Sequence, residues 1–367
     1  MPTHTHRPRP GRTLPISTYR FQINAEQGFA EVADLVDYIA ALGVSHLYLS
    51  PILQAVPGST HGYDVLDHSR LSAEAGGEAG FDALVRRAHA AGLGIIVDVV
   101  PNHMAVPTPV RLNAQLWSVL KEGPASPFAD WFDVSWPEPT STGKFIAGGP
   151  RALLMPVLGD RIGDVLARDE LKLDTSGPEP VLRYFEHEFP VREGTEQLPM
   201  TELVDRQWYR LSYWKVADDE LNYRRFFDVG TLVAVRVEND DVFDQTHATL
   251  LELFRAGKVD GFRIDHPDGL ADPRGYLRRL ADAEHGTDGA WVAVEKILEG
   301  EETLPDDWHC AGTTGYDSML RVGGLFVHPV GAHPLLSTWT RFAGRDGDTV
   351  PQRMHDVVHE SKREVVN

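Results

Sequence analysis

Residues 94–100, with the sequence GIIVDVV, constrain the fold more than any other segment of the chain. Only Asp98 interrupts their apolar character, whereas a strand with one face in water alternates between apolar and polar residues. A strand that is apolar on both sides is typical of a parallel sheet with helices on both faces. We therefore predict an α/β fold in which this segment is an inner strand.

Strands and amphipathic helices alternate along the chain on both sides of a long interruption, as they do in parallel sheets. The helix at 28–42 has apolar residues at helical spacing and ends at Gly43, and the helix at 80–91 ends at Gly92. The predicted strands are residues 16–21, 44–49, 94–100, 259–265 and 291–297, with a sixth near 308–313, and the later helices are 240–256 and 273–282.

The interruption is rich in Pro, Gly, Trp and charged residues. It is far too long for a loop within a compact domain, so we predict an inserted subdomain at residues 105–222. The barrel-like part then comprises residues 13–104 and 223–367, and the Pro-rich residues 1–12 are predicted to be a disordered tail. Beyond residue 320 the pattern predicts helices and no further strand.

The charge balance excludes several kinds of partner. The chain has 54 acidic and 35 basic residues and a formal net charge of −19, which argues against nucleic acid or an anionic membrane. Its single cysteine, Cys310, excludes an internal disulfide and a cysteine-ligated zinc site. We find no signal-peptide pattern, no apolar run of membrane-spanning length and no nucleotide-binding or metalloprotease motif. The expectation is a cytoplasmic protein without cofactor or bound metal.

Polar side chains gather at the carboxyl ends of four predicted strands or in the loops that follow. In a β/α barrel these ends face one mouth, where active sites of that fold lie. The alternative is that strand ends simply collect polar turn residues. The four groups are His61, Tyr63 and Asp64; Asp98, Asn102 and His103; Arg263, Asp265 and His266; and Glu295 with Lys296.

Asp265 and Glu295 are candidates for the two carboxylates of a retaining glycosidase mechanism. Such enzymes hold their two carboxyl groups about 5–5.5 Å apart, and neighbouring strands lie about 4.8 Å apart. Arg263, two residues before Asp265 on the same side of the strand, is expected to keep it ionised at neutral pH. Glu295 ends an apolar strand, where desolvation favours the protonated form that an acid catalyst needs.

Three further side chains have two readings each. Asp98 either ties down loops through hydrogen bonds or contacts substrate. His103 is better suited to hydrogen-bond a substrate than to act as a base beside carboxylates. Tyr63 offers a flat face for stacking on a sugar ring, although an isolated tyrosine is more often part of a core.

Several of these motifs resemble the α-amylase superfamily, glycoside hydrolase family 13. DVVPNH (98–103), GFRID (261–265) and the strand-ending Glu295 are similar to its first three sequence signatures. A finer resemblance, to a trehalose-forming branch of this family, extends from about residue 15 to residue 325. It is carried by the stretches STYRFQ, LGVSHLYLSPIL, PGSTHGYDV, DVVPNHMAV, DELNYRRFFDV, RIDHPDGLADP, VEKIL and AGTTGYD.

The resemblance implies a (β/α)8 TIM-type barrel with a subdomain inserted after its third strand. It also implies that the reducing-end α-1,4 linkage of a maltooligosaccharide is converted into an α,α-1,1 linkage. By this analogy Asp265 is the nucleophile, Glu295 the acid/base and Arg263 the residue that orients Asp265. The implied substrate-binding residues are His61, Tyr63, Asp64, Asp98, Asn102, His103 and His266, of which His266 would help to retain the released glucose.

One signature of the family is missing. Its members use a third catalytic Asp at the end of the seventh strand, and nothing after Gly324 offers it on a strand; His355 and Asp356 lie in a helix-like stretch. We interpret the chain as the N-terminal part of such an enzyme, with five or six barrel strands. A separate chain that supplies the missing strands is then an expected partner, and the polypeptide alone is expected to be inactive. A starch-degrading hydrolase and a catalytically dead glucan-binding remnant are the alternatives.

Overall fold

The structure is a computed structural model that describes residues 14–136, 152–283, 291–344 and 349–366. The tail predicted at residues 1–12 lies outside the described residues. The chain divides into two compact units, which we describe separately. The first comprises residues up to 296 together with 302–314, and the second comprises residues 297–301 and everything from residue 315 onwards.

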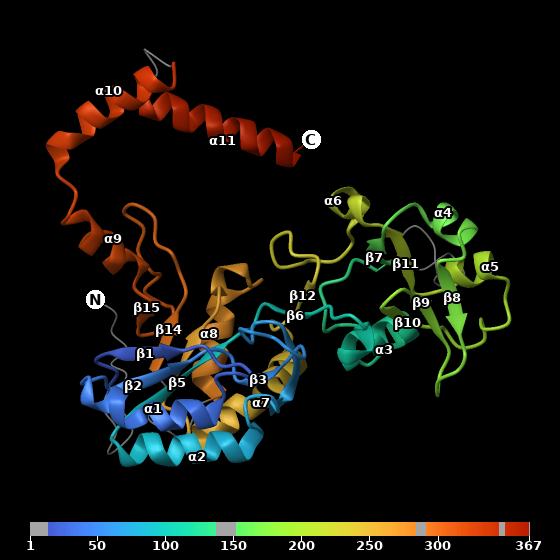
Figure 1. Ribbon diagram of the computed structural model, residues 1–367, viewed down its shortest axis with the longest axis horizontal. Helices are drawn as coiled ribbons and strands as arrows, with labels where there is room; N and C mark the ends of the chain where they lie inside the picture. Colours follow the sequence, from blue (N-terminus) through green and yellow to red (C-terminus); the bar gives the residue numbers. More distant parts are fainter. Residues whose placement is uncertain (1–13, 137–151, 284–290, 345–348, 367) are drawn as a thin grey trace. The chain divides into compact units, whose positions relative to one another are not determined.

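A parallel sheet of six strands organises the first unit (Figure 1). Its order is β1–β2–β5–β13–β14–β15, and every neighbouring pair is parallel. All six residues of β5 are buried, as the apolar run at 94–100 predicts. The strands are β1 (Thr18–Phe21), β2 (His46–Leu49), β5 (Gly94–Val99), β13 (Gly261–Ile264), β14 (Trp291–Val294) and β15 (Gly312–Thr313). The expectation of five or six barrel strands is confirmed.

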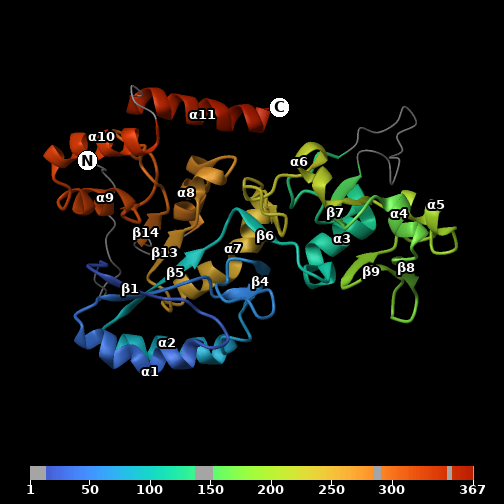
Figure 2. The same ribbon diagram turned by 45° about the horizontal axis from the view of Figure 1, so that its top comes forward.

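Helices connect these strands. The helices α1 (Phe29–Ala41) and α2 (Gly77–Ala90) lie together on one face of the sheet (Figures 1 and 2). In α1 the buried residues recur at helical spacing, but the apolar Leu35 and, just after the helix, Leu42 are exposed. Later connections are made by α7 (Asp240–Arg255) and α8 (Pro273–Ala283).

Two short antiparallel pairs frame the loops at the carboxyl edge of the sheet. β3 (Leu53–Ala55) and β4 (Val65–Leu71) enclose the loop of residues 56–64. β6 (His103–Ala105) pairs with β12 (Leu232–Ala234), so the chain leaves and re-enters the sheet region at one place. We call residues 106–231, which lie between these two strands, the insertion.

The insertion contains its own small sheets and helices. A three-stranded sheet is formed by β8 (Leu171–Asp174), β9 (Val181–Tyr184) and β10 (His187–Pro190), and a two-stranded one by β7 (Leu153–Leu158) and β11 (Tyr209–Tyr213). Its helices are α3 (Ala114–Glu122), α4 (Ile162–Ala167), α5 (Met200–Asp205) and α6 (Ala217–Glu220), with 3-10 turns η1 (Val110–Leu112), η2 (Gly123–Ala125) and η3 (Trp214–Val216).

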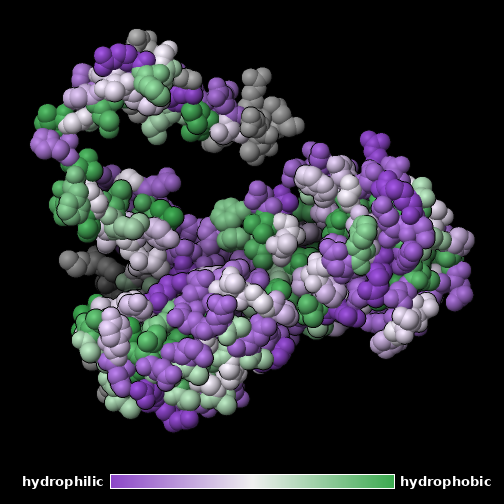
Figure 3. Space-filling view, in the orientation of Figure 1, coloured by the Kyte–Doolittle hydropathy of each residue, from purple (hydrophilic) through white to green (hydrophobic). Residues whose placement is uncertain are grey.

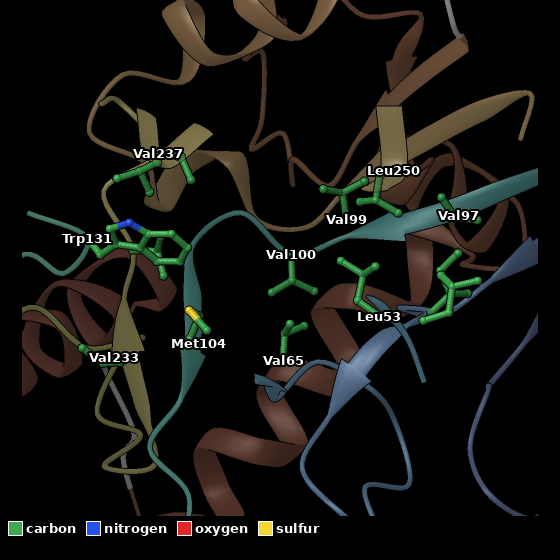
Figure 4. Packing of buried hydrophobic residues seen from close by; sticks show 14 of the residues in the cluster. Leu53, Val65, Val97, Val99, Val100, Met104, Trp131, Val233, Val237 and Leu250 are labelled. Carbon is green, nitrogen blue, oxygen red and sulfur yellow. The ribbon is translucent and has the colours of Figure 1, made fainter. Parts of the chain in front are cut away.

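One apolar cluster joins the sheet to the base of the insertion (Figure 4). Val97 and Val99 of β5 contribute to it, as do Val100 and the fully buried Met104 just beyond the strand. Trp131 is buried in the same cluster. Because burial of apolar side chains is the main favourable term in folding, this packing fixes the loops that carry the polar strand ends.

The second unit is helical in its described residues. It contains α9 (Tyr316–Gly324), the turn η5 (Pro329–Gly331), α10 (Ala332–Phe342) and α11 (Val350–Val366). Many of its apolar side chains are exposed, among them Phe326 and Phe342. Figure 3 shows hydrophobic residues, in green, on the surface of these helices. His355 and Asp356 lie on α11, so the prediction that this pair is not on a strand is confirmed. Among the described residues, no helix is long and apolar enough to cross a lipid bilayer.

Candidate active site

Arg263 is the centre of the polar cluster at the carboxyl edge of the sheet. It lies on β13, directly opposite Asp98 of β5 in the strand register. Its Nη1 donates to Asp98 Oδ1 at 2.8 Å and to Asp265 Oδ1 at 2.7 Å, and its Nη2 pairs with Glu295 Oε1 at 2.8 Å. One guanidinium therefore joins carboxylates from the ends of three neighbouring strands.

The charges in this cluster do not balance, since three carboxylates share one guanidinium. Burial raises the pKa of Asp265 from its ordinary value to about 7, with a further rise from nearby Asp98, and Arg263 offsets this rise only in part. Asp265 is therefore ionised only in part at neutral pH, whereas the sequence pattern predicts the fully ionised form. Burial lowers the pKa of Arg263, but the surrounding carboxylates and Tyr48 outweigh burial and the net shift is upwards, so Arg263 stays charged.

Asp98 is buried beneath this cluster and accepts hydrogen bonds on both oxygens. The hydroxyls of Tyr48 and Tyr63 donate to Oδ2, at 2.8 and 2.5 Å, while Arg263 occupies Oδ1. Burial raises the pKa of Asp98, and these three donors only partly offset it. These hydrogen bonds fit the interpretation that Asp98 ties down neighbouring segments of the chain. It also shows that Tyr63 directs its hydroxyl into the cluster.

Two members of this network, Tyr48 and Arg20, are absent from the predicted site. Arg20 of β1 lies opposite Tyr48 of β2 in the register, and its Nη2 donates to the Tyr63 hydroxyl at 3.1 Å. The available signal was an arginine in the predicted strand 16–21 and a tyrosine in the predicted strand 44–49. That signal is weak, because a lone tyrosine in a strand is usually core.

The turn after Asp265 places a backbone donor against Glu295. His266 has φ 41° and ψ 59°, in the left-handed region that a residue with a Cβ rarely adopts. Its N–H donates to Glu295 Oε2 at 3.3 Å, and its carbonyl accepts from the buried Asn102 Nδ2. The 3-10 turn η4 (Pro267–Gly269) follows. Asn102 thus contacts the backbone of this turn.

His103 is held against the loop of Tyr63. Its Nε2 lies 3.1 Å from the Tyr63 carbonyl oxygen, which can only accept, so Nε2 carries the proton. Burial lowers the pKa of His103 to about 4. A neutral imidazole that already donates to a carbonyl is better suited to hydrogen bonding than to act as a base at neutral pH.

The other predicted residues lie outside the carboxylate cluster. His61 accepts from the Tyr63 N–H at 3.1 Å, and Asp64 accepts from the Ser59 hydroxyl at 2.5 Å, so both contact their own loop. Lys296 pairs with Asp268 at 3.2 Å and with Glu302 at 2.9 Å. Within the described ranges, no three His, Cys, Asp or Glu side chains are grouped so that they could hold a metal ion.

Replacing Asp265 by Asn is expected to raise the free energy of unfolding at pH 8 by about 2 kcal/mol. The raised pKa means that ionised Asp265 opposes folding above pH 7, by at most about 4 kcal/mol at about 1.4 kcal/mol per pKa unit. Below its unfolded pKa the carboxyl is protonated in both states, so the gain should shrink as the pH falls from 7 to 4. Urea unfolding at pH 8 and pH 4 measures both.

Asp160→Asn is the matched control. Asp160 is an exposed carboxylate whose pKa is lowered by hydrogen bonds from the Arg161 backbone and from Arg168, so its replacement should bring no stabilisation at pH 8. A stability loss at pH 8 for Asp265→Asn would contradict the electrostatic account of the cluster.

A six-stranded parallel sheet with acidic side chains at its carboxyl edge is the arrangement of part of a β/α barrel. The family model for the α-amylase catalytic domain matches residues 27–288. The chain belongs to this family.

Several of the proteins that this chain is similar to are named maltooligosyl trehalose synthases. The chain is 40% identical over 347 residues to a putative maltooligosyl trehalose synthase of Mycobacterium tuberculosis, covering 93% of this chain and 42% of that protein. It is 46% identical to maltooligosyltrehalose synthase from Arthrobacter ramosus, with a TM-score of 0.82 over 92% of this chain and 42% of that structure. A hypothetical maltooligosyl trehalose synthase of Sulfolobus tokodaii gives 39% identity and a TM-score of 0.69, covering 83% of this chain and 38% of that one. The chain thus spans about 42% of the length of the curated relatives it matches.

Proposed function

We propose that this chain supplies the nucleophile and the acid/base of an intramolecular transglucosidase. Its substrate would be a maltooligosaccharide, whose reducing-end α-1,4 linkage becomes an α,α-1,1 linkage. The similarity to maltooligosyl trehalose synthases over more than nine-tenths of the chain supports the reaction. A cytoplasmic location and a separate chain that completes the barrel stay predictions.

The observation that carries the proposal is the position of Arg263 between Asp265 and Glu295. Each of its two terminal nitrogens pairs with one of these carboxylates, which brings together the two acids that a retaining mechanism needs. The left-handed turn at His266 adds a backbone N–H to Glu295. Both acids are thus held before substrate arrives, as preorganised catalysis requires.

In the first step the Asp265 carboxylate attacks C1 of the penultimate glucose. The bond from C1 to O4 of the terminal glucose breaks, and Glu295 gives its proton to that oxygen. This leaves a glucosyl ester on Asp265, a deprotonated Glu295 and a free glucose. Because the raised pKa of Asp265 is about 7, a fraction of the molecules carry a protonated Asp265 at neutral pH. The fraction with the carboxylate that can attack increases as the pH rises.

In the second step the released glucose turns and offers its anomeric hydroxyl. Its O1 attacks C1 of the glucosyl ester, the ester bond to Asp265 breaks, and Glu295 takes the hydroxyl proton. Two inversions at C1 keep that centre α and give the α,α-1,1 product. Water attacking instead would give hydrolysis, so glucose retention and exclusion of water decide between isomerase and hydrolase.

The 367-residue polypeptide alone is expected to form no trehalose linkage from maltopentaose. The family's third catalytic Asp would have to lie at the end of a strand. After Thr313, the described residues form helices and turns but no strand. The expected result is therefore an unchanged number of reducing ends. A nonreducing product formed by this polypeptide alone would contradict the expectation.

Supplying the missing part tests the function itself. We would co-express the chain with the part of the Arthrobacter ramosus protein that lies beyond the match, confirm that the two copurify, and incubate the complex with maltopentaose. A fall in reducing ends supports the proposal, and Asp265→Asn in the same complex should abolish it. A rise in reducing ends would instead indicate a hydrolase. A copurified complex that binds maltopentaose and leaves it unchanged would indicate a glucan-binding remnant.

A further inference from the structure

Phe227 is an exposed aromatic residue beside the turn that follows Asp265. Its side chain is 68% exposed, and its φ of 52° lies in the left-handed region. It occupies the second position of the turn closed by the hydrogen bond from Val229 N to Phe226 O, where a positive φ favours Gly, Asn or Asp. A bulky aromatic side chain in water at such a position costs free energy twice, through its backbone and through its exposure.

The segment that carries Phe227 is anchored to the candidate active site. It belongs to residues 221–231, drawn in yellow between α6 and β12 in Figure 1. Arg224 Nη1 donates to the carbonyl of Gly269 at 2.9 Å, which ties the segment to the turn η4. The Phe226 ring packs against both His103, with centroids 4.4 Å apart, and His266, at 5.4 Å.

The Phe227 ring lies at the edge of this aromatic group. Its centroid is 5.1 Å from that of His266, the residue next to Asp265, and 4.7 Å from that of Phe226. Neighbouring rings and the anchored backbone thus limit where it can lie, while most of its surface stays open. An aromatic ring held in this way has an apolar face available beside His266, the residue that follows Asp265.

The charge of the cluster restricts what this face can bind. Asp98, Asp265 and Glu295 surround a single guanidinium, which disfavours an anionic ligand such as a phosphate. A neutral ring with polar edges and an apolar C–H face suits both the carboxylates and the aromatic surface. A pyranose has that chemistry.

We propose that Phe227 is a stacking platform for a glucose ring of the bound oligosaccharide and so contributes to specificity. This inference rests on the proposed function, because it takes the ligand to be a maltooligosaccharide. The ring of Phe227 replaces water on one face of the sugar. This contact offsets the free energy that the left-handed backbone conformation at Phe227 costs.

Calorimetric titration of the copurified complex with maltopentaose, with Asp265→Asn present in every sample to prevent turnover, tests the inference. Phe227→Ala is expected to weaken binding about tenfold, within the range for loss of an aromatic contact. Phe227→Trp and Phe227→Tyr, which keep a flat ring, should stay within about threefold of the parent. Phe227→Gly should also weaken binding about tenfold yet leave the thermal midpoint equal or higher, because Gly adopts a positive φ without strain.

Phe185 provides a matched control within the same chain. It has a φ of 50° and is 62% exposed, but it lies in the turn between β9 and β10, where its ring contacts Tyr184. Phe185→Ala should leave maltopentaose binding unchanged. The same loss of affinity in Phe185→Ala and Phe227→Ala would overturn the inference.

The outcomes separate this inference from the proposed function. If the parent binds maltopentaose and Phe227→Ala binds it equally well, the platform is wrong and the proposed function stands. If the parent does not bind maltopentaose at all, the proposed substrate is wrong, and the platform with it.

Discussion

Replacing Arg263 by Met is expected to lower the free energy of unfolding at pH 8 by about 3–5 kcal/mol, the usual cost of leaving a buried charge without its partner. Arg263 is only 11% exposed at its side chain, and it is the cation that pairs with Asp98, Asp265 and Glu295. Met keeps most of the length and removes the charge. The three carboxylates would then repel one another at the end of the sheet.

The pH dependence distinguishes this electrostatic loss from a packing defect. Removing the guanidinium raises the pKa of the neighbouring carboxyls, so they take up protons as the pH falls and the repulsion disappears. The loss in Arg263→Met should therefore be clearly smaller at pH 5 than at pH 8, as measured by urea unfolding. A loss of equal size at both values would point to packing and contradict the account.

A surface arginine gives the comparison for this variant. Arg168 also pairs with two carboxylates, Asp160 at 3.1 Å and Glu170 at 2.8 Å, but its side chain is 47% exposed. Arg168→Met should cost far less than Arg263→Met, because exposed ion pairs contribute little to stability. The two variants remove the same charge and differ in burial.

Three buried histidines are expected to make the fold sensitive to acid. Burial lowers the pKa of His68 and His103 to about 4 and that of His247 to about 3, from an ordinary value of 6.5. At a pH between each lowered pKa and 6.5, the histidine is protonated in the unfolded chain but not in the folded chain. Their contribution to stability is therefore complete above about pH 6.5 and is lost as the pH falls towards 4. Each contributes at most about 3–5 kcal/mol, at about 1.4 kcal/mol per pKa unit.

His247 is the most direct one to test. Its ring stacks on Phe243 at 4.2 Å, and its Nε2 lies 2.8 Å from the Tyr276 hydroxyl. His247→Gln should lower stability at pH 7 yet flatten the dependence of stability on pH between 7 and 4. The comparison with the parent matters because Asp265, whose pKa is raised, has the opposite dependence in this range. His355, exposed on α11, is the control: His355→Gln should leave the slope unchanged, and an unchanged slope in His247→Gln would refute the prediction.

The inner strands of the sheet are predictable because burial on both faces leaves a local mark. The apolar run at 94–100 becomes β5 with only its last residue outside the strand. The ends of strands are less predictable, because they depend on tertiary contacts of the residues that follow. The predicted strand at 291–297 ends at Val294, and Lys296 beyond it pairs with Asp268 and Glu302.

The site is predictable only where its members follow strands directly. Asp98, Arg263, Asp265 and Glu295 carry that signal, and Arg263 does join the three acids. Arg20 and Tyr48 were missed because their part depends on the register of β1 and β2 and on a loop that returns to them. The partial protonation of Asp265 could not be predicted from its sequence neighbours, because it depends on burial and on carboxylates that other strands bring close, whereas the sequence shows only the nearby Arg263.

The pairing of β6 with β12 has a consequence for how the chain finds this fold. Asp98 and Arg263 face each other in the sheet although 165 positions separate them, and joining such distant segments costs chain entropy. Once β6 and β12 pair, the insertion is closed off and β5 and β13 are joined by a far shorter loop. At about 0.6 kcal/mol for each halving of loop length, this lowers the remaining closure cost by about 1 kcal/mol. The length of the insertion can then change during evolution with little effect on assembly of the sheet.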